Sequence, residues 1–209
     1  MRTATWKRIG GVALVTASVA AALSPPARRW YLSYGATDAE VARALPGDEL
    51  LPQADLTSTR AVSIDAPPSA VWPWLVQMGS GRGGAYTYDW LENLLGLNMH
   101  SAREVLPQFQ HLAVGDVLPM GPAGPAMRVE ICDPHRTLAF RSTDGNWVWS
   151  FNLSALPTGT RLVSRNRIVV PGAAWPARMF YRVVMEPGSL IMERRMLLGI
   201  KDRAEALPV

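Results

Sequence analysis

The sequence predicts an α+β domain that combines an antiparallel sheet with a long C-terminal helix. One strand-like run and two short helical segments are followed by five further strand-like runs, and the chain then ends in an amphipathic helical pattern. With 209 residues, of which 48% are hydrophobic, the chain can bury one core but offers too little for two independent domains.

The first segment, residues 1–35, contains a membrane-directed run. Residues 9–23 carry no charge and have basic residues on both sides. The run is shorter than the ~20 residues that cross a bilayer, but Trp6 and Trp30 suit the two interfaces. We predict a membrane protein held by a single uncleaved anchor, with the membrane as the partner of residues 9–23. A cleaved signal peptide followed by secretion, or an interfacial or buried helix, remains open.

The second segment, residues 36–55, is expected to be a short helix and a linker. Thr37 and Glu40 have the spacing of a capping box, in which side chains satisfy the free backbone amides at the start of a helix. The helix should end before a Pro-Gly turn. The third segment, residues 56–209, is the main domain.

The main domain begins with a strand and two short helices. Residues 56–65 are rich in β-branched residues and are followed by two prolines, which predicts a strand. Ser69 is the expected N-cap of a helix over 69–78. Glycines within 79–84 end that helix, and a second helix is expected over 88–95.

Five β-like runs then indicate an antiparallel meander. They are residues 117–120, 126–132, 137–142, 146–155 and 160–170. In the fourth run Trp147, Trp149 and Phe151 share one face, the period of two that is typical of a half-buried strand. This face of the sheet is therefore predicted to be apolar and aromatic.

The opposite face of the sheet is predicted to be rich in arginine. In the fifth run Arg161, Arg165 and Arg167 share the face that lies opposite Leu162 and Ile168. We expect these arginines to meet water. They raise one hypothesis about function, an interaction protein that docks a partner or an anionic membrane through its arginine-rich sheet face.

The C-terminal residues 177–207 have helical periodicity. Leu190, Leu197 and Ile200 belong to an apolar stripe that recurs about every three or four residues. A Pro-Gly pair at 187–188 is expected to interrupt this helix.

This order of elements resembles the START-like helix-grip (SRPBCC) superfamily, and in particular a mostly bacterial branch of polyketide cyclase/dehydrase-like proteins. The resemblance covers about residues 56–207 and is carried by IDAPPSAVWPWLVQMG, YTYDWLENLLG, LAVGDVLP and MERRMLLGIKDRAE. It implies a curved antiparallel sheet wrapped around the long C-terminal helix, with an elongated apolar cavity between them. Carriers, cyclases and sensors share this fold, so the resemblance by itself implies no reaction.

The glycine-rich run from Gly79 to Gly84 matches the G-x-G-x-x-G string of dinucleotide sites. That motif needs a strand before it and a helix directly after it, whereas here a helix precedes the run and antiparallel strands follow. We therefore interpret the run as a flexible link between two helices, which in helix-grip proteins lies near the cavity mouth. Arg82 is expected to be a solvated loop residue, with contact to an anionic ligand group as the alternative.

Aromatic and methionine side chains are the candidate ligand contacts, because apolar pockets with few polar groups hold small ligands and methionine adapts to irregular shapes. The candidates are Trp74, Met78, Tyr86, Tyr88, Trp90, Phe140, Trp147, Trp149, Phe151, Met192 and Met196. Ordinary core packing by the same residues is the alternative. The leading hypothesis is a membrane-tethered protein that binds a hydrophobic small molecule or lipid in an internal cavity, without catalysis.

Catalytic groups are few, and no catalytic residue is assigned. The chain has no G-x-S-x-G motif, and its one cysteine, Cys132, has no recognisable histidine partner. The alternative function is a polyketide cyclase/dehydrase-like enzyme, for which Tyr88, Asp89 and His100 are the acid–base candidates. Asp89 and Glu92 are interpreted as a solvated helix face. If one of them were buried, its raised pKa would suit acid–base chemistry.

Nucleic acid, metal and cofactor binding are not expected. The net charge of +4 is spread along the chain without a recognition motif. His100, Glu104 and His111 could be drawn as a metal site, but their spacing lacks the close pairings of zinc motifs.

Overall fold

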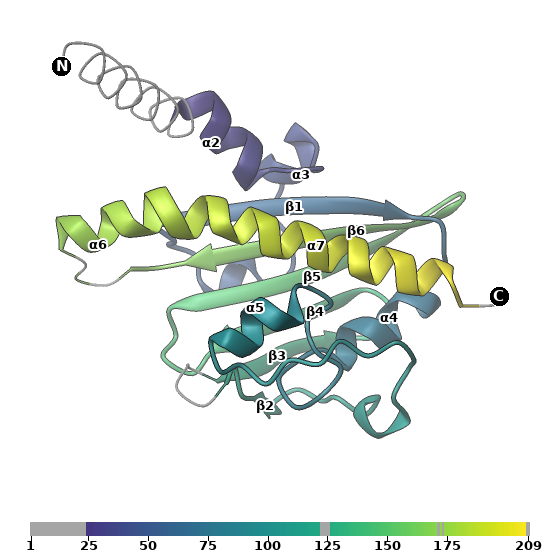
Figure 1. The fold of residues 1–209 in the computed structure, drawn as a ribbon. Coiled ribbons are helices and arrows are strands. Elements are labelled where there is room, and N and C mark those ends of the chain that lie inside the picture. The colour runs from purple at the N-terminus through teal and green to yellow at the C-terminus, as the bar shows by residue number, and fades with distance from the viewer. Residues whose placement is uncertain (1–23, 122–125, 171, 173, 208–209) are drawn as a thin grey trace, which may run out of the picture.

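The computed structural model describes residues 24–121, 126–170, 172 and 174–207, and it has the α+β helix-grip architecture that the sequence predicts (Figure 1). One curved antiparallel sheet packs against a long C-terminal helix. The strands are β1 (Leu56–Ile64), β2 (Val117–Leu118), β3 (Met127–Asp133), β4 (Thr137–Ser142), β5 (Trp147–Leu156) and β6 (Gly159–Ile168). The helices are α2 (Pro25–Leu32), α3 (Asp38–Ala42), η1 (Asp48–Leu50), α4 (Pro68–Val76), α5 (Asp89–Leu94), η2 (Pro107–Phe109), α6 (Trp175–Phe180), the π-helical turn η3 (Tyr181–Met185) and α7 (Glu186–Glu205).

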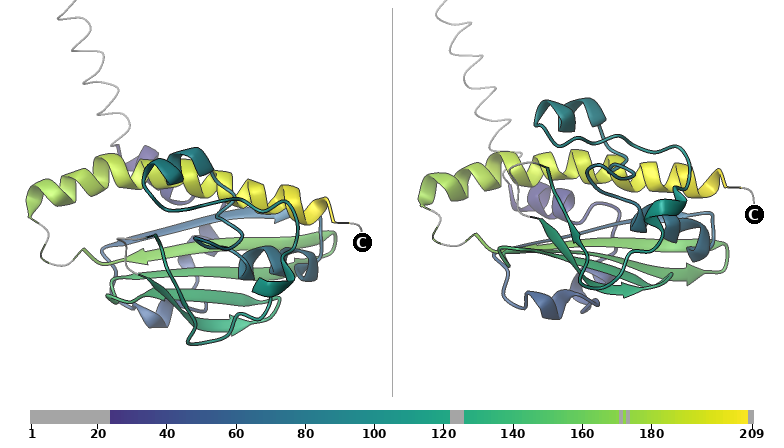
Figure 2. Two further views of the ribbon diagram at one scale, coloured as in Figure 1. Left: turned by 60° about the horizontal axis from the view of Figure 1, so that its bottom comes forward. Right: turned by 90° about the horizontal axis from the view of Figure 1, so that it is seen from below.

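The sheet has the strand order β1-β6-β5-β4-β3-β2. All neighbouring strands are antiparallel, so β3 to β6 form the predicted meander, and β1 joins it beside β6. Figure 2 shows α7 on one face of the sheet and the N-terminal segment around η1 on the other. The main core lies between the sheet, α4 and α7.

The C-terminal helical region differs from the prediction at its proline. Pro187 lies in the first turn of α7, and helical structure continues through it from Trp175 to Glu205. The irregularity is the π-helical turn directly before α7. Proline has no amide hydrogen and crowds the carbonyl four residues earlier, and the wider π turn accommodates both effects. The predicted N-cap of α4 is also wrong, because Pro67 is the N-cap and Pro68 takes the first helical position.

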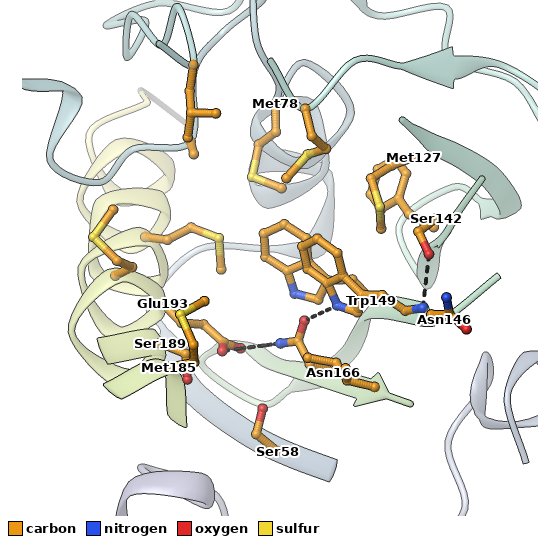
Figure 3. A pocket seen from close by; sticks show the side chains of 18 of the residues that line it. Ser58, Met78, Met127, Ser142, Asn146, Trp149, Asn166, Met185, Ser189 and Glu193 are labelled. Carbon is orange, nitrogen blue, oxygen red and sulfur yellow. Dashed lines mark hydrogen bonds between the residues drawn. The ribbon is translucent and has the colours of Figure 1, made fainter. Parts of the chain in front are cut away.

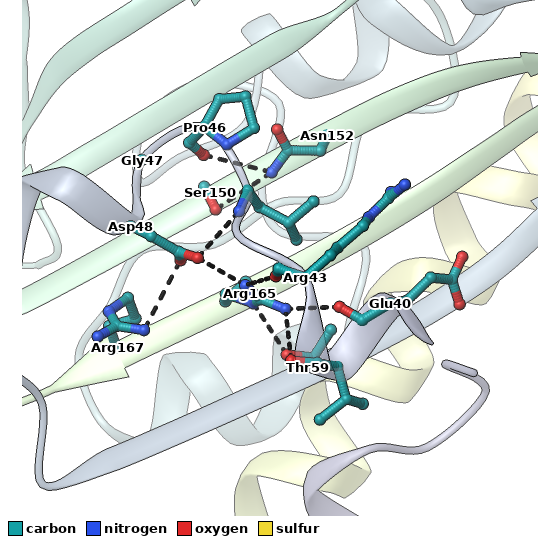
Figure 4. Close-up of polar contacts among 12 residues, drawn as sticks. Glu40, Arg43, Pro46, Gly47, Asp48, Thr59, Ser150, Asn152, Arg165 and Arg167 are labelled. Carbon is teal, nitrogen blue, oxygen red and sulfur yellow. Dashed lines mark hydrogen bonds and ion pairs between the residues drawn. The ribbon is translucent and has the colours of Figure 1, made fainter. Parts of the chain in front are cut away.

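The arginine-rich sheet face is covered by the N-terminal segment, so the expectation that it meets water is wrong. The side chain of Arg165 donates to the carbonyl oxygens of Glu40 at 2.6 Å and Arg43 at 3.0 Å. It also pairs with Asp48 at 2.6 Å, and the residue is only 2% exposed (Figure 4). The cation therefore satisfies backbone oxygens that have no partner in a strand or a long helix.

The two other arginines of this face bind the same segment. Arg161 pairs with Glu40 through two contacts of 2.8 Å. Arg167 donates to the carbonyl oxygens of Leu51 at 2.8 Å and Pro52 at 3.0 Å. The sheet face that was predicted to dock a partner is therefore covered by residues of the same chain. The domain boundary after residue 55 remains a prediction.

The capping box of α3 is confirmed, with Thr37 and Glu40 bonded to each other's backbone amides. The predicted membrane localisation is contradicted: among the residues that the structure describes, none of the helices combines the length and the apolar character that crossing a bilayer requires. Residues 9–23, on which the anchor, the signal peptide and the interfacial helix were based, lie outside the described residues.

Candidate ligand-binding cavity

A cavity of about 530 Å³ lies between the sheet and the helical rod formed by η3 and α7 (Figure 3). The sheet face that borders it carries Trp147 and Trp149 and is called the inner face. Its wall is drawn from strands β1 to β6, from the two helices and from the loops around α5. This volume falls within the range of about 300–1,000 Å³ that is usual for small-molecule sites. The sheet and the helix alone do not fill the space between them.

Methionines dominate the wall of this cavity. Seven of the nine methionines in the chain line it. They are Met78, Met99, Met120, Met127, Met185, Met192 and Met196. An unbranched thioether side chain can take many shapes at low cost, so such a wall can adapt to ligands of different outline.

Two tryptophans from β5 form a flat aromatic part of the wall. The rings of Trp147 and Trp149 are stacked, with centroids 5.7 Å apart. The Trp147 indole donates to Asn166 Oδ1 at 2.8 Å, and the Trp149 indole donates to Ser164 Oγ at 2.9 Å. Because both indole N–H groups are satisfied by the neighbouring strand β6, the ring faces stay fixed in orientation.

A buried ion pair joins the sheet to α7 at the cavity wall. Arg60 is fully buried and forms an ion pair with Glu193. Its remaining donors reach the carbonyl oxygen of Tyr31 at 3.0 Å and Ser189 Oγ at 2.9 Å. Glu193 also accepts from Ser164 Oγ at 2.6 Å. Burial raises the pKa of the Glu193 carboxyl, and the Arg60 charge opposes that rise.

A second carboxyl group in the wall, that of Glu92, has a different environment. Glu92 projects from α5 and is only 6% exposed. Within the described residues, neither Glu92 Oε2 nor the buried hydroxyl of Thr87 has a hydrogen-bond partner. Burial raises the pKa of Glu92; the nearby Thr87 hydroxyl opposes the rise without forming a hydrogen bond of normal geometry, and the Asp89 charge adds to it.

No protein-family model matches this chain, and no curated protein matches its sequence. Solved structures with a similar fold do exist. They include the KanY protein, with 17% identity over 74% of this chain and 100% of that one and a TM-score of 0.49. A Polyketide_cyc-like protein from Corynebacterium glutamicum has 19% identity over 72% and 91%, with a TM-score of 0.38. The di-domain ARO/CYC protein BexL from the BE-7585A biosynthetic pathway has 25% identity over 77% and 54%, with a TM-score of 0.43.

Polyketide-cyclase-like proteins are thus among the structural neighbours. They are of the kind that the sequence resembles. Their identities of 25% or less and TM-scores below 0.5 carry no argument about ligand or reaction. The chemistry of this chain depends on its own residues.

The predicted ligand contacts divide into three groups. Those in the cavity wall are Met78, Phe140, Trp147, Trp149, Met192 and Met196. Those buried in the core away from the cavity are Trp74, Tyr86 and Phe151. Those on the surface are Tyr88 and Trp90, of which Trp90 is 70% exposed. A ligand contact at any of these positions remains a prediction, but only the first group faces the cavity.

The core group has its own packing role. The Tyr86 hydroxyl donates to the carbonyl oxygen of Trp74 at 2.9 Å, and the two rings meet edge to face. The guanidinium of Arg203 lies 4.6 Å from the centre of the Tyr86 ring. These contacts fasten the loop after α4 to α7.

The acid–base candidates do not meet at the cavity. Tyr88 and His100 are exposed. Both carboxylate oxygens of Asp89 are engaged by Ser101, at 2.8 Å from its amide and 2.5 Å from its hydroxyl. Glu92 is the buried carboxyl that the sequence allowed for beside Asp89. Asp89 and Glu92 are three positions apart on the same helix, and this spacing does not show which of the two side chains is buried.

The glycine run is a tight hairpin rather than a flexible link or a phosphate site. Gly79 and Gly84 exchange two backbone hydrogen bonds of 3.0 and 3.1 Å. Arg82 does not point into water. It donates to the carbonyl oxygens of Val76 at 2.9 Å and Phe109 at 3.2 Å, so its cation closes the loop.

His100, Glu104 and His111 are each exposed. In the part of the chain that the structure describes, no group of three or more histidine, cysteine or acidic side chains is placed to hold a metal ion.

Proposed function

We propose that this protein binds a hydrophobic small molecule or lipid in the cavity between its sheet and α7. The observation that carries this proposal is the open volume of about 530 Å³ behind a wall of seven methionines and two oriented indoles. Apolar surface that leaves water contributes about 25 cal/mol per Å², so an apolar ligand that fills this space would gain substantial binding free energy. Because methionine side chains are flexible, the cavity wall can adapt to a class of apolar ligands that differ in shape.

A cavity-filling variant tests the proposal. Met192 projects into the cavity from α7, whereas Ile191 beside it is 59% exposed and absent from the wall. We expect Met192→Trp to weaken binding of an apolar ligand about tenfold or more by occupying its volume, and Ile191→Trp to leave binding unchanged. The measurement is solvent extraction of the purified protein with mass spectrometry, followed by titration with the extracted compound.

Two results would contradict this function. One is the absence of any co-purifying or displaceable apolar compound from the wild-type protein. The other is equal binding by the Met192 and Ile191 variants. Circular dichroism of both variants separates a filled cavity from a misfolded chain.

The alternative of a polyketide cyclase/dehydrase-like enzyme receives no specific support from the geometry. Tyr88, Asp89 and His100 lie outside the cavity wall, and Asp89 is held by Ser101. We therefore propose binding without assigning a reaction.

A further inference from the structure

The carboxyl group of Glu92 is an incomplete polar site within the cavity wall. It lies almost fully buried, and its Oε2 has no hydrogen-bond partner among the described residues. An unsatisfied buried acceptor destabilises the folded protein, and the cost is larger when the group is charged. The Thr87 hydroxyl, which also lines the cavity, has the same deficiency. A bound molecule that donates a hydrogen bond here would satisfy Glu92 Oε2. A ligand hydroxyl could also accept from the Thr87 hydroxyl, and an amine could donate a second N–H to it.

The chain itself offers Glu92 no cation from the cavity wall. Arg60 is the one basic residue among the described residues that line the cavity. All three of its nitrogens are already engaged, by Tyr31, Glu193 and Ser189. The charge of Arg60 is therefore neutralised by Glu193, and its guanidinium has no free position for an anionic group of a ligand.

The charges around the cavity are unbalanced in one direction. Three carboxyl groups line it, those of Glu92, Asp144 and Glu193, against the single guanidinium of Arg60. Asp144 lies at the exposed side of the wall and accepts from Ser142 Oγ at 2.5 Å. This surplus of negative charge opposes a ligand carboxylate and favours a donor or a cation.

From this geometry we infer that the ligand of the cavity is an apolar molecule with a hydrogen-bond donor, an amine or a hydroxyl group, which pairs with the carboxyl group of Glu92 beside Thr87. The inference rests on the proposed function of the cavity and names the class of molecule that it takes. An amine would form a buried ion pair with Glu92, and a hydroxyl would form a neutral or charge-assisted hydrogen bond. The apolar remainder of the ligand would lie against the methionines and the two indoles.

Four probes with the same apolar chain test this inference: dodecylamine, dodecanol, methyl dodecanoate and dodecanoate, each below its micelle concentration. Binding is measured by isothermal titration and by quenching of the wall tryptophans. We expect the amine and the alcohol to bind about tenfold or more tightly than the ester and the carboxylate, because only the first two donate to Glu92. Comparison of the amine with the alcohol identifies which donor the site prefers.

Variants of Glu92 locate the effect. Glu92→Leu should remove the preference for both donors, and Glu92→Gln should remove only the part that depends on charge, with an amine loss of about tenfold. Glu104→Gln changes an exposed glutamate outside the wall and should leave all four affinities unchanged. Both Glu92 variants should fold, since each removes an unpaired buried charge, and thermal unfolding verifies this.

The possible outcomes distinguish a failure of the Glu92 assignment from a failure of the proposed cavity function. If no probe binds the wild-type protein, the proposed cavity function fails together with the inference. If all four bind equally, or if Glu92→Leu retains the donor preference, the cavity binds apolar molecules but the assignment of Glu92 is overturned. Tightest binding by dodecanoate would also overturn it.

Discussion

Two buried glutamates in one cavity wall show how strongly the immediate surroundings decide a residue's role. Glu193 is paired with Arg60 and accepts hydrogen bonds from Ser164 and Asn166. Glu92 has no ion pair in the described structure and keeps an unsatisfied oxygen. The carboxyl group of Glu193 is structural, because its oxygens already have an ion-pair partner and hydrogen-bond donors. The carboxyl group of Glu92 is available to a ligand.

Because the Glu92 carboxyl group is buried and lacks a full set of partners, the free energy of unfolding should depend on pH. Because burial raises its pKa above the ordinary value of 4.5, its contribution to stability is complete below that value and is lost as the pH rises through the raised pKa. Glu92→Gln does not titrate. We therefore expect the variant to gain stability relative to the ligand-free wild-type protein as the pH rises from about 4 to about 7.

Thermal unfolding of the two proteins across this pH range measures the difference. Glu193 titrates in both proteins, so its effect cancels in the comparison. Glu104→Gln serves as the control and should follow the wild-type curve. A constant difference between the Glu92 variant and the wild-type protein would show that Glu92 does not titrate abnormally.

At the scale of elements, the sheet is covered on both faces by different parts of the chain. The helix α7 covers the cavity face, and residues 36–52 cover the arginine-rich sheet face. The second cover is fastened by charged groups, with Glu40 accepting from Arg161 and from the amide of Thr37. Besides the hydrogen bonds within α3 and η1, backbone oxygens of this segment accept hydrogen bonds from arginines of β6.

This fastening predicts a pH-dependent release of the N-terminal segment. The Arg161 hydrogen bond lowers the pKa of Glu40 to about 2, so its contribution is present above the ordinary value of 4.5 and is lost as the pH falls toward about 2. Glu40→Gln should produce the same loosening at neutral pH. Hydrogen exchange of residues 36–52 should then be several-fold faster, with little change in β4 and β5.

The matched control is Asp38→Asn, which removes the carboxylate of an exposed pair with Arg29. Its exchange rates should stay near those of the wild-type protein, since exposed pairs contribute little. Equal effects of the two substitutions would mean that Glu40 does not fasten the segment.

At the scale of the whole molecule, Arg60 connects three layers. It starts on β1, pairs with Glu193 of α7 and donates to the carbonyl oxygen of Tyr31 in α2. Arg28 of α2 adds two contacts to Glu186 of α7, at 2.8 and 2.9 Å. The helical rod is thereby held at a set distance from the sheet, which keeps the cavity open.

Removal of this connection should destabilise the whole fold. Arg60→Met leaves Glu193 buried without its cation, and we expect the free energy of unfolding to fall by about 3–5 kcal/mol. Arg128→Met breaks a more exposed contact of 3.7 Å with Glu130 and should cost less than about 1 kcal/mol. Denaturant unfolding measures both. A loss at Arg60 no larger than that at Arg128 would contradict this role.

The sequence by itself determined the fold class and the order of the main strands and helices. Alternation along β5, the capping box of α3 and the glycines after α4 are local patterns, which depend on neighbours within a few residues. They also placed Trp147 and Trp149 on the inner face, because the side-chain period of a strand is two.

Tertiary structure alone decided which polar groups are buried and what they contact. The arginine face looked open because its cover comes from residues more than 100 positions earlier in the chain. Glu92 turned inward while Trp90, two residues away, turned to solvent, since a six-residue helix is oriented by its packing and not by its own pattern. Burial is a property of the assembled layers, so the charge of the cavity could not be derived from any local stretch of sequence.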